Sequence, residues 1–126
     1  MAKREVKHPE KQVDTGAYSA AVEVDGWVYV SGHGSLDMAT GEVVGEDIET
    51  QTRVTLEHIR KVLTGAGCSM DDVVKSTCHL ADIGDFDAFN RVYSEFFKGV
   101  RPARTTVQSV LPGILVEIDV VARKPG

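Results

Sequence analysis

The sequence contains only two cysteines and lacks both a signal peptide and any long apolar run. Cys68 and Cys78 are too few for a disulfide framework, and neither has a Cys-x-x-Cys partner. Without an apolar stretch of about 18 residues, no membrane-spanning segment is predicted. These absences predict a cytoplasmic protein with reduced thiols and no contact with a membrane. We expect Cys78 in the core, and Cys68, which follows Gly67, to be partly exposed.

An excess of basic residues is also missing. Lys and Arg number 14 against 19 Asp and Glu, which gives a net charge of −5. Binding to a nucleic-acid backbone depends on clustered Lys and Arg, so the sequence predicts no nucleic-acid partner. The few clustered cations lie in the polar N-terminal segment and are interpreted as part of a solvated tail: Lys3, Arg4, Lys7 and Lys11.

Motifs for metals and cofactors are absent as well. His8, His58 and His79 have no metal-ligand spacing with one another or with acidic residues. The segment Gly32-His33-Gly34 is not a phosphate loop, because no Gly-Lys-Ser/Thr sequence follows it. The sequence therefore predicts neither a metal site nor a bound cofactor.

The residues that are present predict one domain over residues 1–126, because this length supports one hydrophobic core but not two. The dipeptide Asp25-Gly26 separates two β-prone runs and favours the tight turn of a hairpin, in which both turn residues take positive φ. Apolar residues at helical spacing predict helices over 48–66 and 86–98, the second capped by Asp85. Further runs predict strands over residues 19–24, 27–31, 73–80, 101–110 and 114–122, and a weaker one over 4–8.

The order of these elements is hairpin, helix, strand, helix, strand, strand. It indicates an α+β fold with a single mixed sheet and two helices on one face. The strands carry apolar residues on both faces, so we expect the uncovered face to be buried against other copies of the chain. The pattern predicts an oligomer without giving the number of chains.

Two charged residues stand in the last pair of predicted strands. Arg104 shares a strand face with Thr106 and Gln108, and Glu117 lies within an otherwise apolar run. Such charges are costly in a half-buried sheet unless they pair or bind a ligand. They therefore indicate a site, although an ion pair between Arg104 and Glu117, or with a neighbouring subunit, is equally open from the residues alone.

From Gly16 to Ala122 the chain resembles a known family, the Rid (YjgF/YER/UK) enamine/imine deaminases. The motifs that carry the resemblance are Gly16-Ala-Tyr-Ser19, Val30-Ser-Gly32, Thr40-Gly41-Glu42, Asp85-Phe86 with Asn90 and Tyr93, Phe96-Phe97, Pro102-Ala-Arg-Thr105 and Val116-Glu-Ile118. The resemblance implies a chorismate-mutase-like fold and a homotrimer with a central β-barrel and active sites between subunits. It also implies hydrolysis of imines, formed from enamines such as 2-aminoacrylate, to 2-oxo acids and ammonium without a cofactor or metal.

The resemblance further implies roles for individual residues. Arg104 matches the arginine that binds the substrate carboxylate, and a guanidinium fork suits that group. Glu117 matches the glutamate that positions or activates water, which is work suited to a carboxyl group. Tyr18 matches a tyrosine that closes over the substrate. The remaining matches line the pocket and are Ser31, Gly32 and Asn90, although Asn90 could equally be part of the polar face of its helix.

Three departures bear on the substrate. Many members have Pro at the position of Ala17, Gln or a similar residue at His33, and Cys at Thr106. Thr106 should line the same pocket as Arg104, and His33 could contribute a proton. These changes leave room for a specialised deaminase acting on substrates such as 3-aminoacrylate or 2-aminomuconate, or for a non-catalytic trimer that binds 2-oxo or imino acids. Ribonuclease activity, attached to some relatives, is disfavoured by the net charge.

Overall fold

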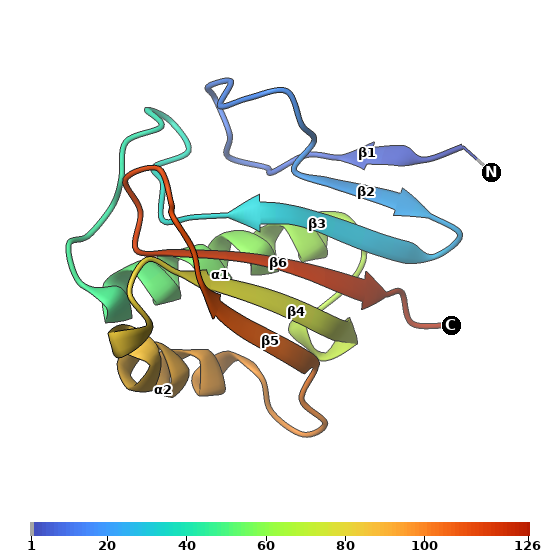
Figure 1. Ribbon diagram of the computed structural model, residues 1–126. Helices are drawn as coiled ribbons and strands as arrows, with labels where there is room; N and C mark the ends of the chain where they lie inside the picture. Colours follow the sequence, from blue (N-terminus) through green and yellow to red (C-terminus); the bar gives the residue numbers. More distant parts are fainter. Residues whose placement is uncertain (1) are drawn as a thin grey trace.

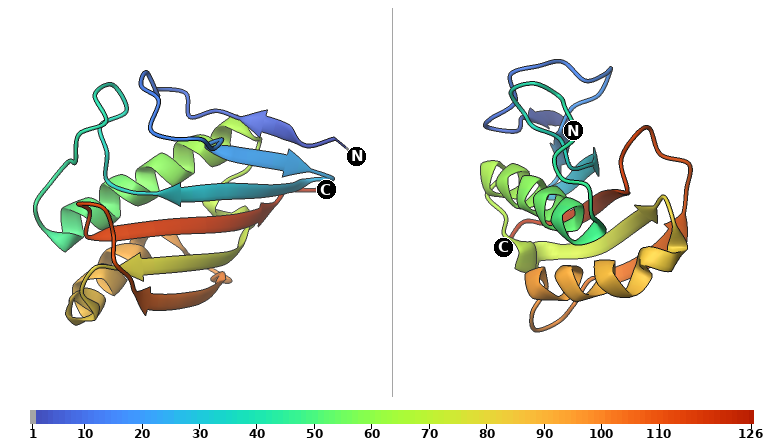
Figure 2. Two further views of the ribbon diagram at one scale, coloured as in Figure 1. Left: turned by 45° about the horizontal axis from the view of Figure 1, so that its top comes forward. Right: turned by 90° about the vertical axis from the view of Figure 1, so that its left-hand side faces the viewer.

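Two helices cover one face of a six-stranded sheet in the computed structural model, which describes residues 2–126 (Figure 1). The elements in chain order are β1 (Arg4–Val6), β2 (Ala21–Val24), β3 (Trp27–His33), α1 (Ile48–Gly65), β4 (Val73–Leu80), α2 (Phe86–Phe96), β5 (Ala103–Gln108) and β6 (Val116–Arg123). The strand order is β1-β2-β3-β6-β4-β5, and only β4 and β5 are parallel. Figure 2 shows both helices on the same side of the sheet, so the predicted α+β arrangement is confirmed.

The hairpin between β2 and β3 forms where the sequence predicts it. Asp25 and Gly26 both have positive φ, 52° and 81°, and Val24 pairs directly with Trp27 across the turn. This is the backbone twist that a two-residue hairpin needs, because it matches the right-handed twist of the flanking strands.

Helix α1 follows its local signals closely. The Asp47 carboxylate accepts a hydrogen bond from the Thr50 N–H at 2.9 Å, which caps the N-terminus. Beyond the C-terminus, Gly67 takes the left-handed conformation, with φ of 80°. The predicted apolar stripe is buried against the sheet and comprises Ile48, Thr52, Thr55, Leu56, Ile59, Val62 and Leu63.

Helix α2 differs from its prediction at both ends. Asp85 makes no capping hydrogen bond; instead a 3₁₀ turn over Ile83–Asp85 precedes the helix, and the Asp82 carboxylate accepts from the Gly84 N–H at 2.8 Å. The helix ends at Phe96 rather than at residue 98. Phe97 is extended, which turns its ring into the core with its centroid 4.6 Å from that of Tyr93.

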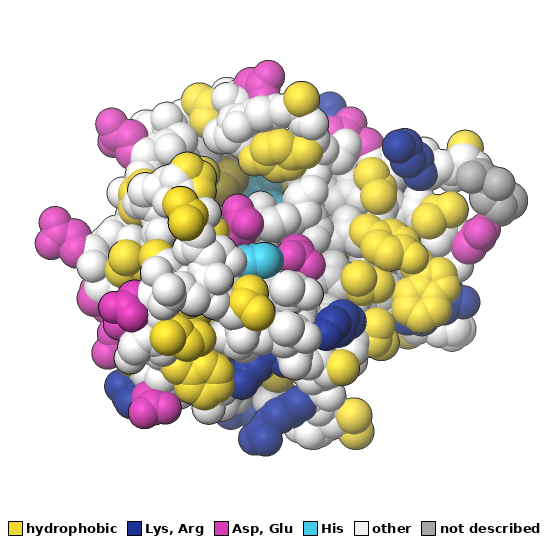
Figure 3. Space-filling view, in the orientation of Figure 1, with side chains coloured by type: hydrophobic (Ala, Val, Ile, Leu, Met, Phe, Trp, Pro, Cys, Tyr) yellow, Lys and Arg dark blue, Asp and Glu magenta, His cyan; other side chains and the backbone are white. Residues whose placement is uncertain are grey.

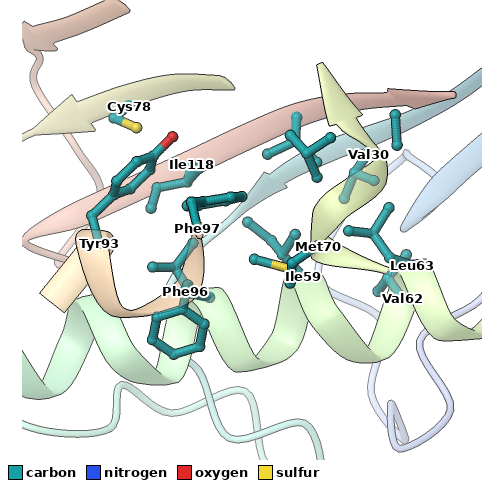
Figure 4. Close-up of a cluster of buried hydrophobic side chains, with 14 of the residues drawn as sticks. Val30, Ile59, Val62, Leu63, Met70, Cys78, Tyr93, Phe96, Phe97 and Ile118 are labelled. Atoms are coloured by element: carbon teal, nitrogen blue, oxygen red, sulfur yellow. The ribbon is translucent and has the colours of Figure 1, made fainter. Parts of the chain in front are cut away.

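The core lies between the helices and the sheet (Figure 4). Tyr93, Phe96 and Phe97 are buried beside Ile59 of α1 and Ile118 of β6. Together these contacts give the two helices a fixed position against the strands.

Both cysteines are buried, so the expected exposure of Cys68 is wrong. The chain turns back after Gly67, and the Cys68 N–H donates to the Leu63 carbonyl at 2.9 Å, which draws its side chain inward. Cys78 lies in the core as predicted, and burial raises the pKa of its thiol to about 12. Neither thiol is therefore an exposed thiolate.

The N-terminal segment is not the solvated tail that its polarity suggested. Strand β1 pairs with β2, Arg4 forms a 2.5 Å salt bridge with Glu23, and Val6 and His8 are buried. Glu10 binds Lys61 of α1 at 2.9 Å. These partners lie 19 to 51 residues away in the sequence, so composition alone did not reveal them.

A chain of hydrogen bonds through two histidines fixes this segment to α1. The Glu10 N–H donates to Nδ1 of His8 at 3.0 Å, and Nε2 of His8 lies 3.0 Å from Nδ1 of His58. Nε2 of His58 lies 2.6 Å from the Leu36 carbonyl, which can only accept. The pattern is satisfied when both rings are neutral, with the proton on Nε2 of each. Burial, followed by the charge of neighbouring His58, lowers the pKa of His8 to about 4, and burial also lowers the pKa of His58.

We expect the free energy of unfolding to fall between pH 7.5 and pH 5.5. His8 has a lower pKa in the folded protein than the value of about 6.5 in the unfolded chain, so the unfolded chain binds more protons as the pH drops below 6.5. The loss that His8 contributes at pH 5.5 is about 1 kcal/mol. Urea denaturation at the two pH values measures it. His8→Gln should show a smaller pH-dependent loss, whereas His79→Gln, outside this cluster, should keep it; an unchanged loss in His8→Gln would contradict the assignment.

Candidate active site

A cavity of about 490 Å³ lies at the end of β3, beside β6. This volume is within the range of about 300–1,000 Å³ that is usual for small-molecule sites. Five of the residues singled out from the sequence line it, namely Tyr18, Ser31, Gly32, His33 and Glu117. They come from the loop before β2, the end of β3 and the start of β6.

One extra residue in β3 shapes this cavity. Val30 pairs with Val120 and His33 with Ile118, so three steps along β3 match two along β6. A β-bulge of this kind bends the strand and redirects its side chains. At the bulge, a β-carbon on Gly32 would lie only 2.9 Å from Cδ of Glu117. The missing side chain of Gly32 therefore leaves room for the Glu117 carboxylate against β3.

Glu117 is half-buried and faces the uncovered side of the sheet. Its neighbours Val116 and Ile118 point the other way, into the core. Because side chains alternate along the strand, this carboxylate lies outside the core. The free-energy cost of burying a charge, which the apolar run suggested, therefore does not arise. No salt bridge within residues 2–126 involves Glu117. The carboxylate is thus available to a ligand in the cavity.

Tyr18 and Ser31 border the same cavity but differ in how firmly their hydroxyl groups are held. Tyr18 is 48% exposed, and its hydroxyl is hydrogen-bonded to the Thr15 hydroxyl. Ser31 is held more firmly, because its hydroxyl donates to the Ser19 carbonyl at 2.6 Å. Its oxygen retains lone pairs that can accept from a ligand.

His33 lies inward of the bulge and is buried. Its Nδ1 lies 2.6 Å from the Ser31 carbonyl, so this nitrogen carries the proton of the neutral ring. Burial lowers the pKa of His33, which keeps the ring uncharged at neutral pH. The ring consequently shapes the cavity wall as a neutral group.

Arg104 belongs to a second group of residues on the helix side of β5. Its guanidinium donates to the Asn90 side-chain oxygen at 2.8 Å. It lies 4.7 Å from the ring centroid of Tyr93, with Phe86 and Phe89 at 5.4 and 5.6 Å. Within residues 2–126 no Asp or Glu forms a salt bridge with it. Aromatic faces and one amide orient this cation without neutralising it.

Thr106 lies two residues further along the same face of β5, as predicted, and pairs with Cys78 of β4. Its hydroxyl oxygen is buried and has no hydrogen-bond partner among the described residues. A buried hydroxyl without a partner is unfavourable, which makes it available to a group that enters from outside the chain.

The two groups do not meet within one chain. Strand β4 lies between β5 and β6; Arg104 is opposite Ser76, which is buried under α2, whereas Glu117 is opposite His79 on the uncovered face. The two side chains therefore leave the sheet on opposite sides. The ion pair between Arg104 and Glu117 that the sequence left open does not form, and Asn90 is the partner of Arg104 instead.

Sequence reasoning missed several residues of the cavity, chiefly Lys11, Thr15, Leu36, Met38, Pro112 and Ile114. They lie in loops, where no periodic pattern marks the side that faces a ligand. The polar character of residues 1–16 even suggested the opposite for Lys11, namely full solvation.

The uncovered face of the sheet carries exposed aromatic residues. Trp27 is 38% and Tyr29 is 46% exposed, and Val107 of β5 is 40% exposed. Figure 3 views this face and shows hydrophobic side chains gathered over the half that β2 and β3 form. Such a surface is typical of an interface with another chain.

Within residues 2–126, no group of three or more His, Cys, Asp or Glu side chains is arranged to hold a metal ion. Across the same residues, no helix combines the length and apolarity needed to cross a membrane.

The fold and the cavity define a class of small α+β proteins with a cavity between the bulged end of β3 and β6. A family model described as Endoribonuclease L-PSP matches residues 10–124. A RutC family protein of Saccharolobus solfataricus is 50% identical over 111 residues, which are 86% of this chain and 88% of the relative. The human 2-iminobutanoate/2-iminopropanoate deaminase is 39% identical over 109 residues, 85% of this chain and 80% of the human protein.

Solved structures agree with these matches. The crystal structure of RidA from an Antarctic Psychrobacter bacterium is similar at a TM-score of 0.87 and 32% identity, over 95% of this chain and 99% of that one. The chain belongs to the Rid family, also called the YjgF family, as its motifs predicted.

Proposed function

We propose that the protein hydrolyses imines of 2-amino acids to 2-oxo acids and ammonia. The observation that carries the proposal is the half-buried Glu117 carboxylate, which lies against Gly32 in a small-molecule cavity without a salt-bridge partner among residues 2–126. The similarity to mammalian deaminases at about 40% identity supports the same class of reaction.

The proposed reaction needs only water and proton transfer. The Glu117 carboxylate takes a proton from a water molecule while the water oxygen bonds to the imine carbon, and Glu117 then passes this proton to the nitrogen, which gives an amino alcohol. Transfer of the second proton to nitrogen then breaks the C–N bond, releasing ammonia and leaving the carbonyl of the 2-oxo acid. When the substrate is an enamine such as 2-aminoacrylate, protonation of its terminal carbon first gives the imine.

We further propose that a complete site needs two chains of a homotrimer. Arg104 and Asn90 lie on the helix side of the edge strand β5, whereas Glu117 lies in the cavity on the other side of the sheet. In a cyclic assembly, the Arg104 group of one chain can lie over the Glu117 cavity of the next. Arg104 would then bind the substrate carboxylate through the N–H groups that Asn90 leaves free.

A direct experiment measures imine hydrolysis. A pyridoxal-phosphate-dependent dehydratase generates 2-aminoacrylate from serine, and the release of 2-oxopropanoate is followed with and without the protein. Semicarbazide competes for the imine and reveals acceleration as a lower yield of the trapped product. We expect acceleration that increases with protein concentration. Thermal stabilisation by 2-oxopropanoate without any acceleration would support a non-catalytic binding protein instead.

The name of the matching family model raises ribonuclease activity as a separate possibility. The net charge of −5 does not favour it, because binding to RNA phosphates depends on clustered cations. The cavity is lined by one carboxylate, Glu117, and one cation, Lys11, among mostly apolar or neutral residues, which is far from the cluster of cations that a phosphate backbone requires.

A further inference from the structure

Lys11 is a cation that lines the cavity and has no role in the proposed reaction. It lines the cavity from the loop before β2, and its ammonium lies 4.7 Å from the centroid of the Tyr18 ring. The loop itself is anchored: the Lys11 N–H donates to the His8 carbonyl at 3.3 Å, and the Gln12 N–H donates to the Met38 carbonyl at 2.8 Å. Ordered backbone and an aromatic face therefore present this charge to the cavity.

The charge of Lys11 is not neutralised by the described part of the chain. No Asp or Glu within residues 2–126 forms a salt bridge with Lys11, and Glu117 is the one acidic residue among those lining the cavity. Burial is the main cause that lowers the pKa of His33 in the cavity wall, with smaller contributions of the same sign from the charges of His58 and Lys11. A cavity with a free cation attracts an anionic group of the ligand.

The proposed reaction already assigns the α-carboxylate of the substrate to Arg104 of a neighbouring chain. The cavity that contains Glu117 is also lined by Leu36, Met38 and Ile114, so a substrate with its imine carbon beside Glu117 can place an apolar part of its side chain against them. We propose that the pocket is selective for imino acids whose side chain ends in a second carboxylate, and that Lys11 binds this carboxylate. The inference rests on the proposed function. Among common amino acids, only aspartate and glutamate carry an anionic side chain at neutral pH, so the substrates are imines of acidic amino acids.

The test compares two imines of equal length, generated by amino-acid oxidases from glutamate and from 2-aminopentanoate with catalase present. Both have five carbons, and only the first ends in a carboxylate. We expect the protein to favour the glutamate-derived imine in kcat/KM. In Lys11→Met the ratio of the two kcat/KM values should fall about 10- to 100-fold, the size of a charge-assisted contact. If Lys11 bound the α-carboxylate instead, both values would fall together, and an unchanged ratio would overturn the proposal.

Binding of the products separates this proposal from the proposed function. Calorimetric titration compares 2-oxoglutarate with 2-oxopentanoate, which differ in the same terminal group. Tighter binding of 2-oxoglutarate that is lost in Lys11→Met would support the role of Lys11 even if neither imine were hydrolysed, in which case only the proposed function would fail. Equal affinities in the unsubstituted protein would overturn the role of Lys11. Lys7→Met, which removes an exposed charge from the same segment outside the cavity, is the matched control.

Discussion

An Arg104→Ala variant is expected to lose about 10²- to 10³-fold in kcat/KM for imine hydrolysis while keeping its fold. Asn90 occupies only part of the guanidinium, and the remaining N–H groups can hold the two oxygens of a substrate carboxylate. Removing them leaves the α-carboxylate of the substrate without the paired N–H donors that hold it. The measurement is the rate of 2-oxo acid release from an imine generated in situ, with circular dichroism and urea denaturation as checks of the fold.

Two further variants test whether the loss is specific to the guanidinium group of Arg104. Arg104→Lys keeps the charge but not the fork, so we expect an intermediate loss of about tenfold. Arg101→Ala removes an exposed arginine three residues away and should behave like the unsubstituted protein. The unfolding free energy of Arg104→Ala should drop by only about 1 kcal/mol, because the contacts with Asn90 and Tyr93 are lost at a half-buried position. Full activity in Arg104→Ala would remove the arginine from the mechanism.

The parts of the fold that the sequence predicted well depend on neighbours within a few residues. Asp25-Gly26 forms the predicted turn with positive φ at both residues, and the predicted start of α1 at residue 48 coincides with a local contact, the Asp47 cap on Thr50. The prediction that Asp85 caps α2 is wrong within the same range: the Asp82 carboxylate accepts from the Gly84 N–H at the start of a 3₁₀ turn, and the Asp85 side chain makes no capping hydrogen bond. Local signals identify the turn but not which of two similar residues forms it.

Long-range placement could not be read from the sequence. Strands β5 and β6 follow one another along the chain, which made a pair between Arg104 and Glu117 plausible, but β4 lies between them in the sheet. The N-terminal segment appeared solvated because its partners, Glu23 and His58, are distant in the sequence. The family resemblance proposed the site residues as one set, whereas their division between two faces of the sheet became visible only in the structure.

The second large effect is expected for Glu117→Gln. A glutamine fills the same space against Gly32 but cannot take the proton of the attacking water, so kcat should fall about 10²- to 10⁴-fold. Substrate binding should change much less, because the shape of the cavity is kept. Asp119→Asn is the matched control, since it removes a carboxylate from the same strand and the same face two residues away. A Glu117→Gln variant with unchanged kcat would mean that another group activates the water.

Mixing the two inactive variants tests whether the site is shared between chains. Arg104→Ala retains the cavity with Glu117, and Glu117→Gln retains Arg104, so a site between one chain of each kind contains both functional residues. In trimers formed at random from equal amounts, about one quarter of the sites are complete, because each needs a particular variant on each side of a directional interface. Co-expression should therefore recover about one quarter of the unsubstituted activity. If both residues acted from the same chain, no complete site would form. The mixture would then stay as inactive as its components, although its chains still assemble.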